Sequence, residues 1–591
     1  MESETRNCQN CKKDFIIEPE DFNFYEKLKV PAPTWCSRCR AIRRVIFRNE
    51  RFLFKKTDFK TGKEIFSAYP RDSVLKIYDH NFWWSDNWDA MEYGRSYDFS
   101  RSFFEQFNEL RISVPSCSRL IENSVNSDYC NNVLDFKNCY MTFSGGIGEN
   151  LFYGVGANSL KDSMDFYYTK DSISCYETFS VIDSYEVFFS IECGGCRNVW
   201  FSLNCRDCSD CFGCVNLNHK KYCIFNEQYT KEEYRDRISE FNLGSYSFLL
   251  DIKEKVKEFR KKFPIKFMHT MQSPNCSGDY IYGSKNIKKS FHIFKSENLK
   301  FSQSLYKAKD SYDYTISGWN SELIYECTSC GKNCSNLKFC LECWPNSNNL
   351  EYCIECHSCS DCFGCVGLKK KQYSIFNKQY SKEEYITLRE KIIKHMYHMP
   401  YIDEENRIYK YGEFFPLEFS SFAYNETLAL EYFPTSKEEV LNQGYIWRDP
   451  FKRDYKIEIM LNELPDDIKN INEEIINKTI ACAHDGLCEC NCSSAFKIIE
   501  GEFQFYKKFN LPIPRLCPNC RFSERIKQLN PINFYHQKCN CNGIISSNKI
   551  YKNTTKHFHD IQSCPNEFET SYSPDRQEII YCEKCYQQEV Y

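Results

Sequence analysis

Residues 205–215 read CRDCSDCFGCV, and residues 356–366 read CHSCSDCFGCV, at an offset of 151. The first copy lies in a run of 12-residue segments that begin at Asn126, Asn138, Asn150, Asp162, Ser174, Glu186, Asn198, Asp210 and Tyr222. Positions 3 and 6 of these segments are mostly large and apolar, whereas positions 2, 5, 8 and 11 are mostly small. A short fixed period predicts a solenoid, in which each coil buries its face only against its neighbours. Aromatic residues separated by Asn, Asp and Ser favour a β-solenoid over helical repeats.

A helix is predicted to follow each array. Thr230-x2-Glu233 and Ser381-x2-Glu384 are capping boxes, a pattern that marks the start of a helix. Each helix would cover the last coil, whose exposed edge could otherwise pair with another chain. A charged amphipathic helix is also expected between the arrays, at residues 251–262.

The cysteines of the two motifs allow three interpretations. Those of the first copy occupy positions 8, 11, 2 and 5 of the repeat, and they are Cys205, Cys208, Cys211 and Cys214. In a 12-residue coil these positions would point inward on different sides, so we expect structural thiols, with zinc or an iron–sulfur cluster as alternatives. If positions 2, 4 and 6 pointed inward, the coil would be larger and this argument weaker. One group keeps the repeat poorly and is the best candidate for an extra zinc site in the middle of the chain: Cys327, Cys330, Cys340 and Cys343.

Two copies of one cysteine module stand at the ends of the chain. Counted from Cys11 and from Cys492, both copies have Phe, Tyr, Pro, Pro, Cys, Cys and Arg at +4, +14, +20, +22, +25, +28 and +29. Two Cys-x2-Cys pairs supply four thiolates, which can close a tetrahedral zinc site. A unit this short cannot build a sufficient core, so metal binding and folding would be one event. The predicted ligands of the first copy are Cys8, Cys11, Cys36 and Cys39.

The fourth ligand is open in the second copy and in a further module at the C-terminus. Glu489 occupies the place of Cys8 in the second copy, so its predicted set is Cys488, Cys492, Cys517 and Cys520, with Cys490 as the alternative to Cys488. The predicted set of the C-terminal module is His559, Cys564, Cys582 and Cys585, with His557 as the alternative to His559. Another possible half-site is Cys539-x-Cys541, joined with Cys482 or His484. About three zinc ions are therefore expected, and more if the cysteines of the solenoid arrays, which we call the ladder cysteines, also bind metal.

These modules resemble the zinc-ribbon or treble-clef modules of uncharacterised proteins from small-genome, candidate-phylum bacteria, in which cysteine repeats lie between zinc modules. The resemblance covers most of the chain. It rests on the duplicated unit C-x2-C…P-x-P-x2-C-x2-C-R, on YCEKCY at 581–586, WWSDNWD at 83–89 and YDFSR at 97–101, and on the CFGCV motifs. The resemblance implies zinc but no activity. Ile561 departs from the resemblance, because the usual module has at this position the second ligand of the knuckle that contains Cys564. The resemblance therefore leaves the fourth ligand of that site undefined.

A basic helix is expected after the last two cysteines of each duplicated module, where a treble clef begins its helix. The arginines of the first copy recur at i, i+4, i+8 and i+11 and would form one stripe able to contact phosphates. The alternatives are a solvated face, or one paired to acidic segments of the same protein. The candidate partner-binding residues are Arg40, Arg44, Arg48, Arg51, Arg521 and Arg525.

The net charge of the chain and the motifs that it lacks limit the classes of function that we expect. A formal charge of −4 excludes binding of polyanions through bulk charge, although not through a local basic patch. No apolar run approaches the roughly 18 residues of a membrane-spanning helix, and the start lacks the apolar region of a secretory signal, so we expect a cytoplasmic protein with no membrane contact. The chain has no P-loop, no Rossmann glycine pattern, no Gly-x-Ser-x-Gly and no His-Glu-x-x-His motif. No small-molecule substrate is therefore evident.

We predict a mainly β, multi-domain protein with zinc-ribbon/treble-clef modules at both ends, flanking two 12-residue-repeat β-solenoid arrays capped by helices. Its expected function is that of a non-catalytic multi-zinc scaffold that docks a protein or nucleic-acid (RNA or DNA) partner through basic treble-clef helices and flat solenoid faces. The alternative is a zinc-dependent nucleic-acid-processing enzyme. The expected domains are a zinc module with its basic helix at 1–52, an aromatic-rich α+β segment at 53–115, the first array and capping helix at 116–242, a helical linker at 243–275, the second array and capping helix at 276–398, an α+β linking segment at 399–480, the second copy of the zinc module at 481–535 and a C-terminal zinc module at 536–591.

Overall fold

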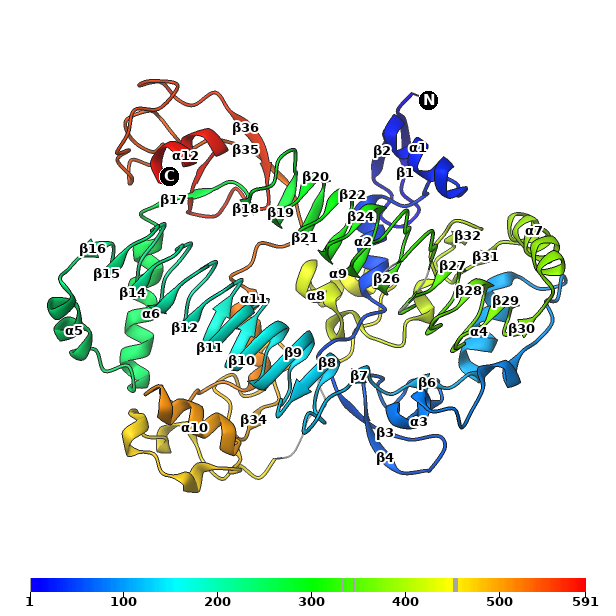
Figure 1. The fold of residues 1–591 in the computed structure, drawn as a ribbon, viewed down its shortest axis with the longest axis horizontal. Coiled ribbons are helices and arrows are strands. Elements are labelled where there is room, and N and C mark those ends of the chain that lie inside the picture. Colours follow the sequence, from blue (N-terminus) through cyan, green and yellow to red (C-terminus); the bar gives the residue numbers. More distant parts are fainter. Residues whose placement is uncertain (1, 332–333, 340, 344–345, 450–454, 591) are drawn as a thin grey trace. The chain divides into compact units, whose positions relative to one another are not determined.

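The computed structural model describes residues 2–331, 334–339, 341–343, 346–449 and 455–590 and is mainly β (Figure 1). Contacts within the chain divide it into two compact units, each built from segments that are far apart in the sequence. Unit 1 comprises Met1–Arg119, Met268–Arg448 and Pro531–Phe534. Unit 2 comprises Leu120–Phe267, Asp449–Asn530 and Tyr535–Tyr591. Each array therefore shares a unit with a cysteine module from the far end of the chain.

Unit 2 contains the first β-solenoid array, a sheet in which the strands follow one another in chain order from β7 to β16 (Figure 1). Partners in neighbouring parallel strands are 12 residues apart, as in Val187↔Val199 and Val199↔Cys211, which confirms the predicted period. The last strand pairs antiparallel with its neighbour. The strands are β7 (Ile121–Glu122), β8 (Asn131–Lys137), β9 (Phe143–Phe152), β10 (Val155–Tyr167), β11 (Lys170–Phe179), β12 (Tyr185–Phe188), β13 (Arg197–Trp200), β14 (Ser209–Phe212), β15 (Lys221–Ile224) and β16 (Glu227–Gln228).

Every third residue of this array points into the coil, at positions 2, 5, 8 and 11 of the repeat as predicted. Buried inward side chains of the central coils are Ser172, Cys175, Thr178, Val181, Ser184, Val187, Ser190, Cys193, Cys196, Val199, Ser202, Cys205, Cys208, Cys211 and Cys214. The residue before an inward residue turns the chain with a left-handed backbone, for example Asp171 at φ 48° and Asp183 at φ 50°. Asp and Asn tolerate this conformation better than most residues, which explains their recurrence at the corners.

Small inward side chains hydrogen-bond to the backbone of the stacked coils. Ser202 Oγ donates to the carbonyl of Trp200 at 3.0 Å and accepts from the N–H of Cys214 at 3.1 Å. The Cys214 thiol in turn contacts the carbonyl oxygens of Phe212 at 3.4 Å and Cys223 at 3.5 Å. These contacts support the structural interpretation of the ladder cysteines.

Unit 1 contains the second array. Three successive coils have 13 residues, since Thr315 pairs with Thr328, Thr328 with Leu341 and Leu341 with Ile354. The extra residues explain why the group that begins at Cys327 keeps the repeat poorly; Cys340 and the side chain of Cys330 lie outside the described residues. The strands are β18 (Thr270–Met271), β19 (Gly278–Tyr282), β20 (Lys285–Lys288), β21 (Ser290–Phe294), β22 (Glu297–Lys300), β23 (Gln303–Tyr306), β24 (Lys309–Tyr312), β25 (Thr315–Gly318), β26 (Thr328–Cys330), β27 (Asn348–Glu351), β28 (Ser360–Phe363), β29 (Gln372–Ile375) and β30 (Lys378–Gln379).

Helices follow both arrays, as predicted. In α5 (Lys231–Ser239) the hydroxyl of Thr230 accepts from the N–H of Glu233, and Ser381 caps α7 (Lys382–His398) in the same way. The expected helix between the arrays is α6 (Tyr246–Arg260). At the end of each array an asparagine side chain replaces a backbone partner: Asn377 accepts from the N–H of Val366 and donates to its carbonyl. The last coil thus keeps its hydrogen bonds without a further strand.

Short elements complete the units. The remaining secondary structure of unit 1 is β1 (Glu4–Asn7), β2 (Asp14–Ile17), α1 (Pro19–Leu28), α2 (Ser37–Val45), β3 (Phe54–Thr57), β4 (Glu64–Ser67), β5 (Ile77–Tyr78), α3 (His80–Trp84), η1 (Ala90–Tyr93), α4 (Phe103–Ser113), β6 (Ser116–Cys117), β31 (Tyr401–Ile402), β32 (Ile408–Tyr409), η2 (Leu417–Phe419), η3 (Tyr424–Glu426), α8 (Leu428–Tyr432) and α9 (Lys437–Asn442). That of unit 2 is β17 (Pro264–Lys266), η4 (Leu461–Glu463), η5 (Ile468–Asn470), η6 (Glu473–Ile475), β33 (Ile480–Ala481), β34 (Ala495–Phe496), α10 (Glu500–Lys508), α11 (Pro518–Ile526), β35 (Tyr535–Lys538), β36 (Glu567–Thr570), β37 (Ile579–Tyr581) and α12 (Glu583–Val590).

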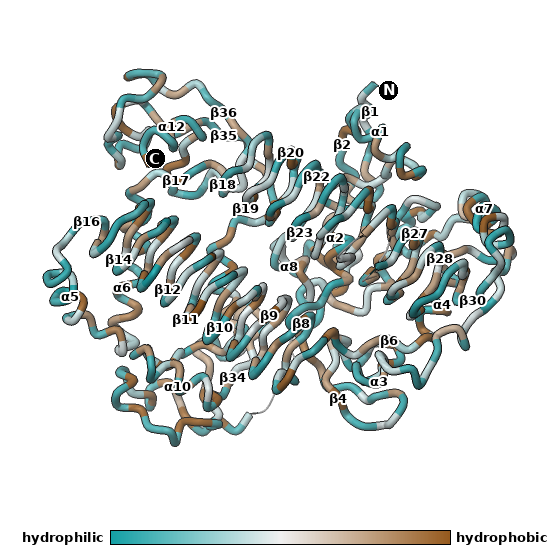
Figure 2. Tube along the Cα trace, in the orientation of Figure 1, coloured by the Kyte–Doolittle hydropathy of each residue, from teal (hydrophilic) through white to brown (hydrophobic). Residues whose placement is uncertain are grey.

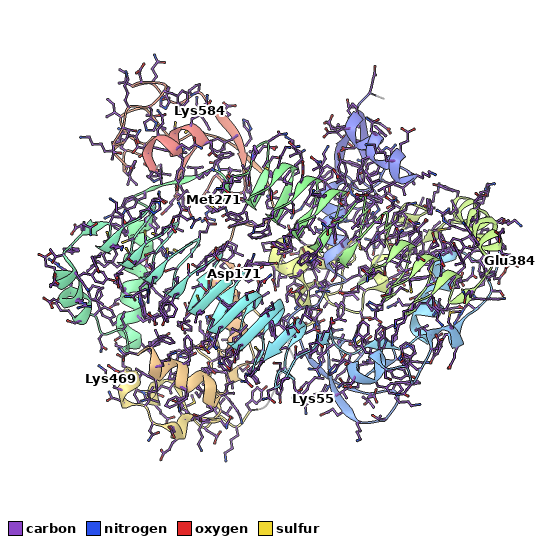
Figure 3. All side chains as sticks on the ribbon, in the orientation of Figure 1. Lys55, Asp171, Met271, Glu384, Lys469 and Lys584 are labelled. Carbon is purple, nitrogen blue, oxygen red and sulfur yellow. The ribbon has the colours of Figure 1, made fainter. Side chains whose placement is uncertain are left out.

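Hydrophobic and hydrophilic residues alternate along the coils of both arrays (Figure 2). Side chains project from the outer faces, among them Asp171 on β11 (Figure 3). None of the helices in the described ranges combines the length and the apolar character needed to cross a membrane.

Candidate metal centres

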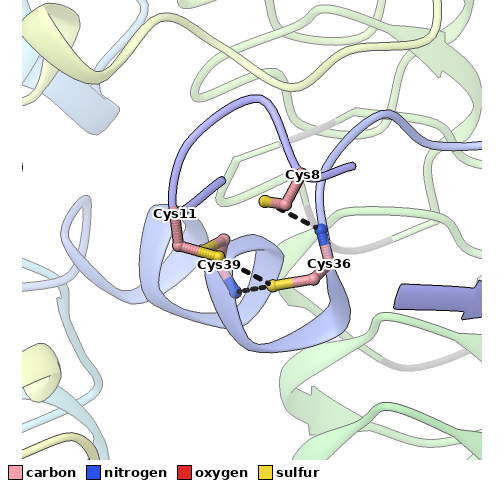
Figure 4. Close-up of side chains that lie close together, drawn as sticks. All are labelled: Cys8, Cys11, Cys36 and Cys39. Atoms are coloured by element: carbon pink, nitrogen blue, oxygen red, sulfur yellow. Dashed lines mark hydrogen bonds between the residues drawn. The ribbon is translucent and has the colours of Figure 1, made fainter. Parts of the chain in front are cut away.

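The N-terminal module brings its four predicted ligands together (Figure 4). Cys8 directly follows strand β1, and Cys36 caps helix α2, whose first turn contains Cys39. The Sγ atoms of Cys11 and Cys36 are 3.8 Å apart, and the backbone N–H of Cys36 donates to the Sγ of Cys8 at 3.2 Å. Hydrogen bonds from the thiols of Cys36 and Cys39 hold the pKa of the Cys8 thiol well below its ordinary value.

This arrangement fits a four-coordinate thiophilic metal. In a tetrahedron with zinc–sulfur bonds of about 2.3 Å, neighbouring sulfur atoms lie about 3.8 Å apart. The sulfur atoms of Cys11 and Cys36 have this spacing, and the ligand atoms of all four residues lie within 4.8 Å of one another. The donor set and its spacing therefore suit a structural metal ion with no open coordination position.

The second copy forms the same kind of group with a different fourth member. Cys482 lies with Cys492, Cys517 and Cys520, whereas we expected Cys488 or Cys490 in this place. The Sγ of Cys520 is 3.5 Å from that of Cys517 and 3.9 Å from that of Cys482. Cys482 directly follows strand β33, as Cys8 follows β1, so the backbone places it correctly although nine residues separate it from Cys492.

Cys488 and Cys490 belong to an adjacent group, together with His484 and Cys520. The Sγ of Cys520 is 3.6 Å from that of Cys488 and 3.8 Å from that of Cys490. Nδ1 of His484 is 3.9 Å from the Sγ of Cys490. Cys520 therefore lies in both groups of this module.

The C-terminal module repeats this pattern. Cys539 joins Cys564, Cys582 and Cys585, in the place for which we expected His559 or His557. The Sγ of Cys564 is 3.8 Å from that of Cys582 and 3.6 Å from that of Cys585. Both histidines belong instead to an adjacent group, together with Cys541 and Cys585. Cys585 therefore lies in both groups of this module.

The candidate ligands that the sequence-based prediction missed share a backbone position. In each module the first cysteine comes one residue after a strand and accepts the N–H of the third cysteine at 3.2 Å; the pairs are Cys8 with Cys36, Cys482 with Cys517 and Cys539 with Cys582. A cysteine at the end of a predicted strand was thus the signal that could have identified them. The fixed Cys-x2-Cys spacing was misleading, because the loop after this cysteine differs in length between modules.

The arginines that follow the cysteines of the N-terminal module are buried by side chains of the second array. Arg40 Nη2 is 2.9 Å from Asp313 Oδ2, and Arg44 Nη1 is 3.0 Å from Asp313 Oδ1. The guanidinium of Arg40 also lies over the ring of Phe301, 5.3 Å from its centroid. Between them, Arg43 pairs with the carboxylates of Glu326 and Glu413.

The second copy docks on the first array through equivalent residues. Arg521 Nε is 3.1 Å from Asp165 Oδ2, and Arg525 Nη1 is 2.8 Å from Asp165 Oδ1. The guanidinium of Arg521 lies over Tyr153, 4.7 Å from the ring centroid. Tyr153 and Asp165 precede Phe301 and Asp313 by 148 residues each, the offset of the arrays before the three longer coils.

These ion pairs correct the expectation of an arginine stripe that is free for a partner. Arg40, Arg44, Arg521 and Arg525 pair with aspartates of their own chain and are at most 5% exposed. Arg48 contacts Glu50 and Glu342, and Arg51 contacts Glu431 at 3.1 Å. The alternative that the stripe pairs with acidic segments of the same protein describes this arrangement.

No protein-family model matches the chain, and a search of curated proteins finds no match either.

Proposed function

We propose that the chain is a non-catalytic scaffold, in which zinc-ribbon or treble-clef modules hold Zn²⁺ and clamp two β-solenoid arrays that bind a protein or nucleic-acid partner in the cytoplasm. One observation carries this proposal: both duplicated modules direct two arginines onto one buried aspartate of a solenoid coil. A metal ion that orders such a module would fix the helix that carries these arginines. The modules would then serve the arrays and not a reaction.

The charges of these arginine–aspartate contacts, which we call the clamp, also support a structural role. A buried carboxylate between two guanidinium groups is stable only when all partners are held in position. Thiolate coordination at the start of the same helix would supply that constraint, since Cys39 precedes Arg40 and Cys520 precedes Arg521. The groups of four cysteines leave no coordination position for a substrate, which disfavours the alternative of a zinc-dependent nucleic-acid-processing enzyme.

The partner surface that we propose is one row of outward side chains on the first array. Neighbours in the row face each other in adjacent coils. The row consists of Lys137, Glu149, Lys161, Ile173, Tyr185, Arg197, Ser209 and Lys221. The contacts within the row differ along its length. Glu149 pairs with the two lysines beside it, Lys137 and Lys161, whereas the guanidinium of Arg197 lies over the ring of Tyr185. Four basic and two apolar side chains on one straight row suit a long, extended partner.

Metal removal tests the structural part of the proposal. Zinc should be present in the purified full-length chain, and a chelator should lower the melting temperature and open α2 and α11 to hydrogen exchange. A chain that contains no zinc, or that is unaffected by its removal, would refute the zinc scaffold.

Salt dependence tests the partner surface. If the row binds nucleic acid, fluorescence anisotropy with single-stranded RNA or DNA should give an affinity that falls with salt, and Lys137→Ala, Arg197→Ala and Lys221→Ala should each reduce the slope of log K against log[salt] by about 0.7. The control is Lys231→Ala, an exposed lysine of α5 that lies outside the row. If the row variants bound nucleic acid like the unaltered chain and only the control variant changed the affinity, this surface would be refuted. Absence of any nucleic-acid binding would leave a protein as the partner.

A further inference from the structure

Cys520 and Cys585 each stand between two groups of metal-ligating side chains. The Sγ of Cys520 is 3.5 Å from that of Cys517 on one side and 3.6 Å from that of Cys488 on the other. The Sγ of Cys585 is likewise 3.6 Å from that of Cys564 and 3.3 Å from Nε2 of His559. We propose that both cysteines are bridging thiolates, each joining two Zn²⁺ ions, so that the chain holds five ions. This inference rests on the structural zinc ions proposed above.

The number of ligands fits two ions in each of these modules. Two separate tetrahedral ions require eight ligands, but a thiolate shared between them reduces the requirement to seven. Each module supplies seven. They are Cys482, His484, Cys488, Cys490, Cys492, Cys517 and Cys520 in the second copy, and Cys539, Cys541, His557, His559, Cys564, Cys582 and Cys585 in the C-terminal module.

Most ligand distances within the additional groups are close to those of tetrahedral coordination; the exception is the 2.7 Å between the Sγ atoms of Cys488 and Cys490, which is shorter than the about 3.8 Å between two thiolates on one zinc ion. With zinc–sulfur and zinc–nitrogen bonds of about 2.3 and 2.1 Å, a sulfur and a nitrogen ligand lie about 3.6 Å apart. Nδ1 of His557 is 3.3 Å from the Sγ of Cys541, and Nε2 of His559 is 3.3 Å from the Sγ of Cys585. In the second copy, the Sγ atoms of Cys490 and Cys520 are 3.8 Å apart.

The second nitrogen of each C-terminal histidine provides an independent indication. Metal-bound histidines characteristically donate their other ring N–H to a carboxylate or a carbonyl, which fixes the tautomer. Nε2 of His557 lies 2.8 Å from a carboxylate oxygen of Glu589, and Nδ1 of His559 lies 2.6 Å from the carbonyl oxygen of Gln562. Backbone N–H groups of Thr554 and Thr555 also donate to Glu589, which orients its buried carboxylate. Each imidazole is therefore oriented with one nitrogen toward sulfur.

The N-terminal module differs at the equivalent place and serves as an internal comparison. Cys39 corresponds to Cys520, but only two residues separate Cys8 from Cys11, whereas nine separate Cys482 from Cys492. The longer loop carries the additional ligands. In the short loop Asn10 donates from its amide to the Sγ of Cys39 at 3.5 Å. Cys39 thus has an amide where Cys520 has further ligands, and one ion is expected in this module.

Reconstitution of the full-length chain with ¹¹³Cd²⁺ tests the bridges directly. We expect five cadmium ions per chain by mass spectrometry of metal content. The ¹¹³Cd NMR spectrum should show two pairs of resonances split by coupling through a shared sulfur, and one unsplit resonance from the N-terminal module. Native zinc content, measured on protein purified without a chelator, should also be five.

Three variants assign the ions. His484→Ala with Cys488→Ser and Cys490→Ser should remove one ion and the splitting of its neighbour. Cys541→Ser with His557→Ala and His559→Ala should do the same in the C-terminal module. Lys13→Ala, at an exposed position of the N-terminal module, is the control and should leave the metal count unchanged. Circular dichroism identifies any variant that fails to fold, and the splitting in the unaltered chain remains informative in that case.

The possible results separate the two proposals. Three ions would refute the additional sites and leave the structural zinc ions intact, whereas no ions would refute both. Five ions without splitting would refute the shared thiolates. The sulfur atoms of Cys488 and Cys490 are 2.7 Å apart, so these residues could instead form a disulfide. Four ions, together with a protein mass lower by two hydrogens, would show that disulfide and refute the bridge at Cys520.

Discussion

Arg40 contacts Asp313 with its guanidinium 2.9 Å from the carboxylate, and neither side chain is more than 2% exposed. Arg521 and Asp165 form the equivalent contact in the other unit. The duplication that produced the two modules therefore included the surface on which each one docks. In both units the array is completed by a module from the opposite end of the chain, so neither array forms its clamp with the module nearest to it in sequence.

Removing the charge of Asp313 should destabilise unit 1 strongly. Asp313→Asn leaves the guanidinium groups of Arg40 and Arg44 buried without a counterion, and breaking a buried ion pair in this way typically costs about 3–5 kcal/mol. Hydrogen exchange of peptides from α2, followed across a urea series, measures the loss locally, because a chain of two units need not unfold in one step.

The matched control for this experiment is Asp310→Asn. Asp310 is exposed in the same array, where its carboxylate continues a row of asparagine side chains and accepts from Asn298 at 2.7 Å. Asparagine suits this position, so we expect a change within about 0.5 kcal/mol. Equal effects of the two substitutions would argue against the clamp.

A serine should replace a ladder cysteine at little cost. Cys214 is fully buried, and Ser202, the inward residue one coil earlier, shows that a hydroxyl fits the array interior. Cys214→Ser should therefore cost less than Cys214→Leu, which overpacks the coil by about 1–3 kcal/mol. Urea denaturation followed by the exchange of peptides from β14 measures both variants.

The metal content of the Cys214→Ser variant provides the control. If the ladder thiols are structural, this variant should contain as many metal ions as the unaltered chain. A lower metal count would instead mean that the ladder binds metal.

Glu355 should make unit 1 more stable at lower pH. Burial raises the pKa of Glu355 to about 7 from an ordinary value of 4.5, against the hydrogen bonds from the N–H of Cys117 and the hydroxyl of Tyr69. The folded state therefore holds this proton more tightly than the unfolded state. The stabilisation is fully present below about pH 4.5 and is lost as the pH rises to about 7, by up to ~3 kcal/mol.

The variant Glu355→Gln isolates this contribution. Glutamine does not titrate, so the variant should gain stability relative to the unaltered chain between pH 5 and pH 8, as measured by urea midpoints at constant ionic strength. Glu122→Gln, at an exposed position in the other unit, is the control and should show no such trend. A pH-independent difference for Glu355→Gln would contradict a raised pKa.

The repeat, the helical caps and the positions of the inward cysteines could be predicted because they obey local rules. Most coils of the first array present small residues to their interior at the same four positions, and this constraint is visible as a period of 12. The coils of 13 residues that follow Thr315 could not be anticipated, because the sequence shows only that the group that begins at Cys327 departs from the period of 12.

The arginine clamp and the fourth ligands depend on contacts that distance in sequence conceals. Arg40 and Asp313 are 273 residues apart, so the basic stripe was visible in the sequence but its acidic partner was not. The metal groups close through space, and for this reason Cys482 can replace Cys8 in spite of a loop of different length. The sequence therefore identified most cysteines of the candidate metal groups but not how they divide into groups.

Glu589 should control the affinity of the additional ion in the C-terminal module. Its carboxylate accepts from Nε2 of His557 at 2.8 Å and so keeps Nδ1 directed at the Sγ of Cys541. Loss of such a partner typically weakens metal binding 10–100-fold. Glu589→Gln should therefore release one zinc ion at a lower concentration of a chromogenic chelator, while the ion held by Cys539, Cys564 and Cys582 is released as before. Glu569→Gln, at an exposed position of β36, should leave both release steps unchanged. If Glu589→Gln released both ions together or neither earlier, Glu589 would not act through His557.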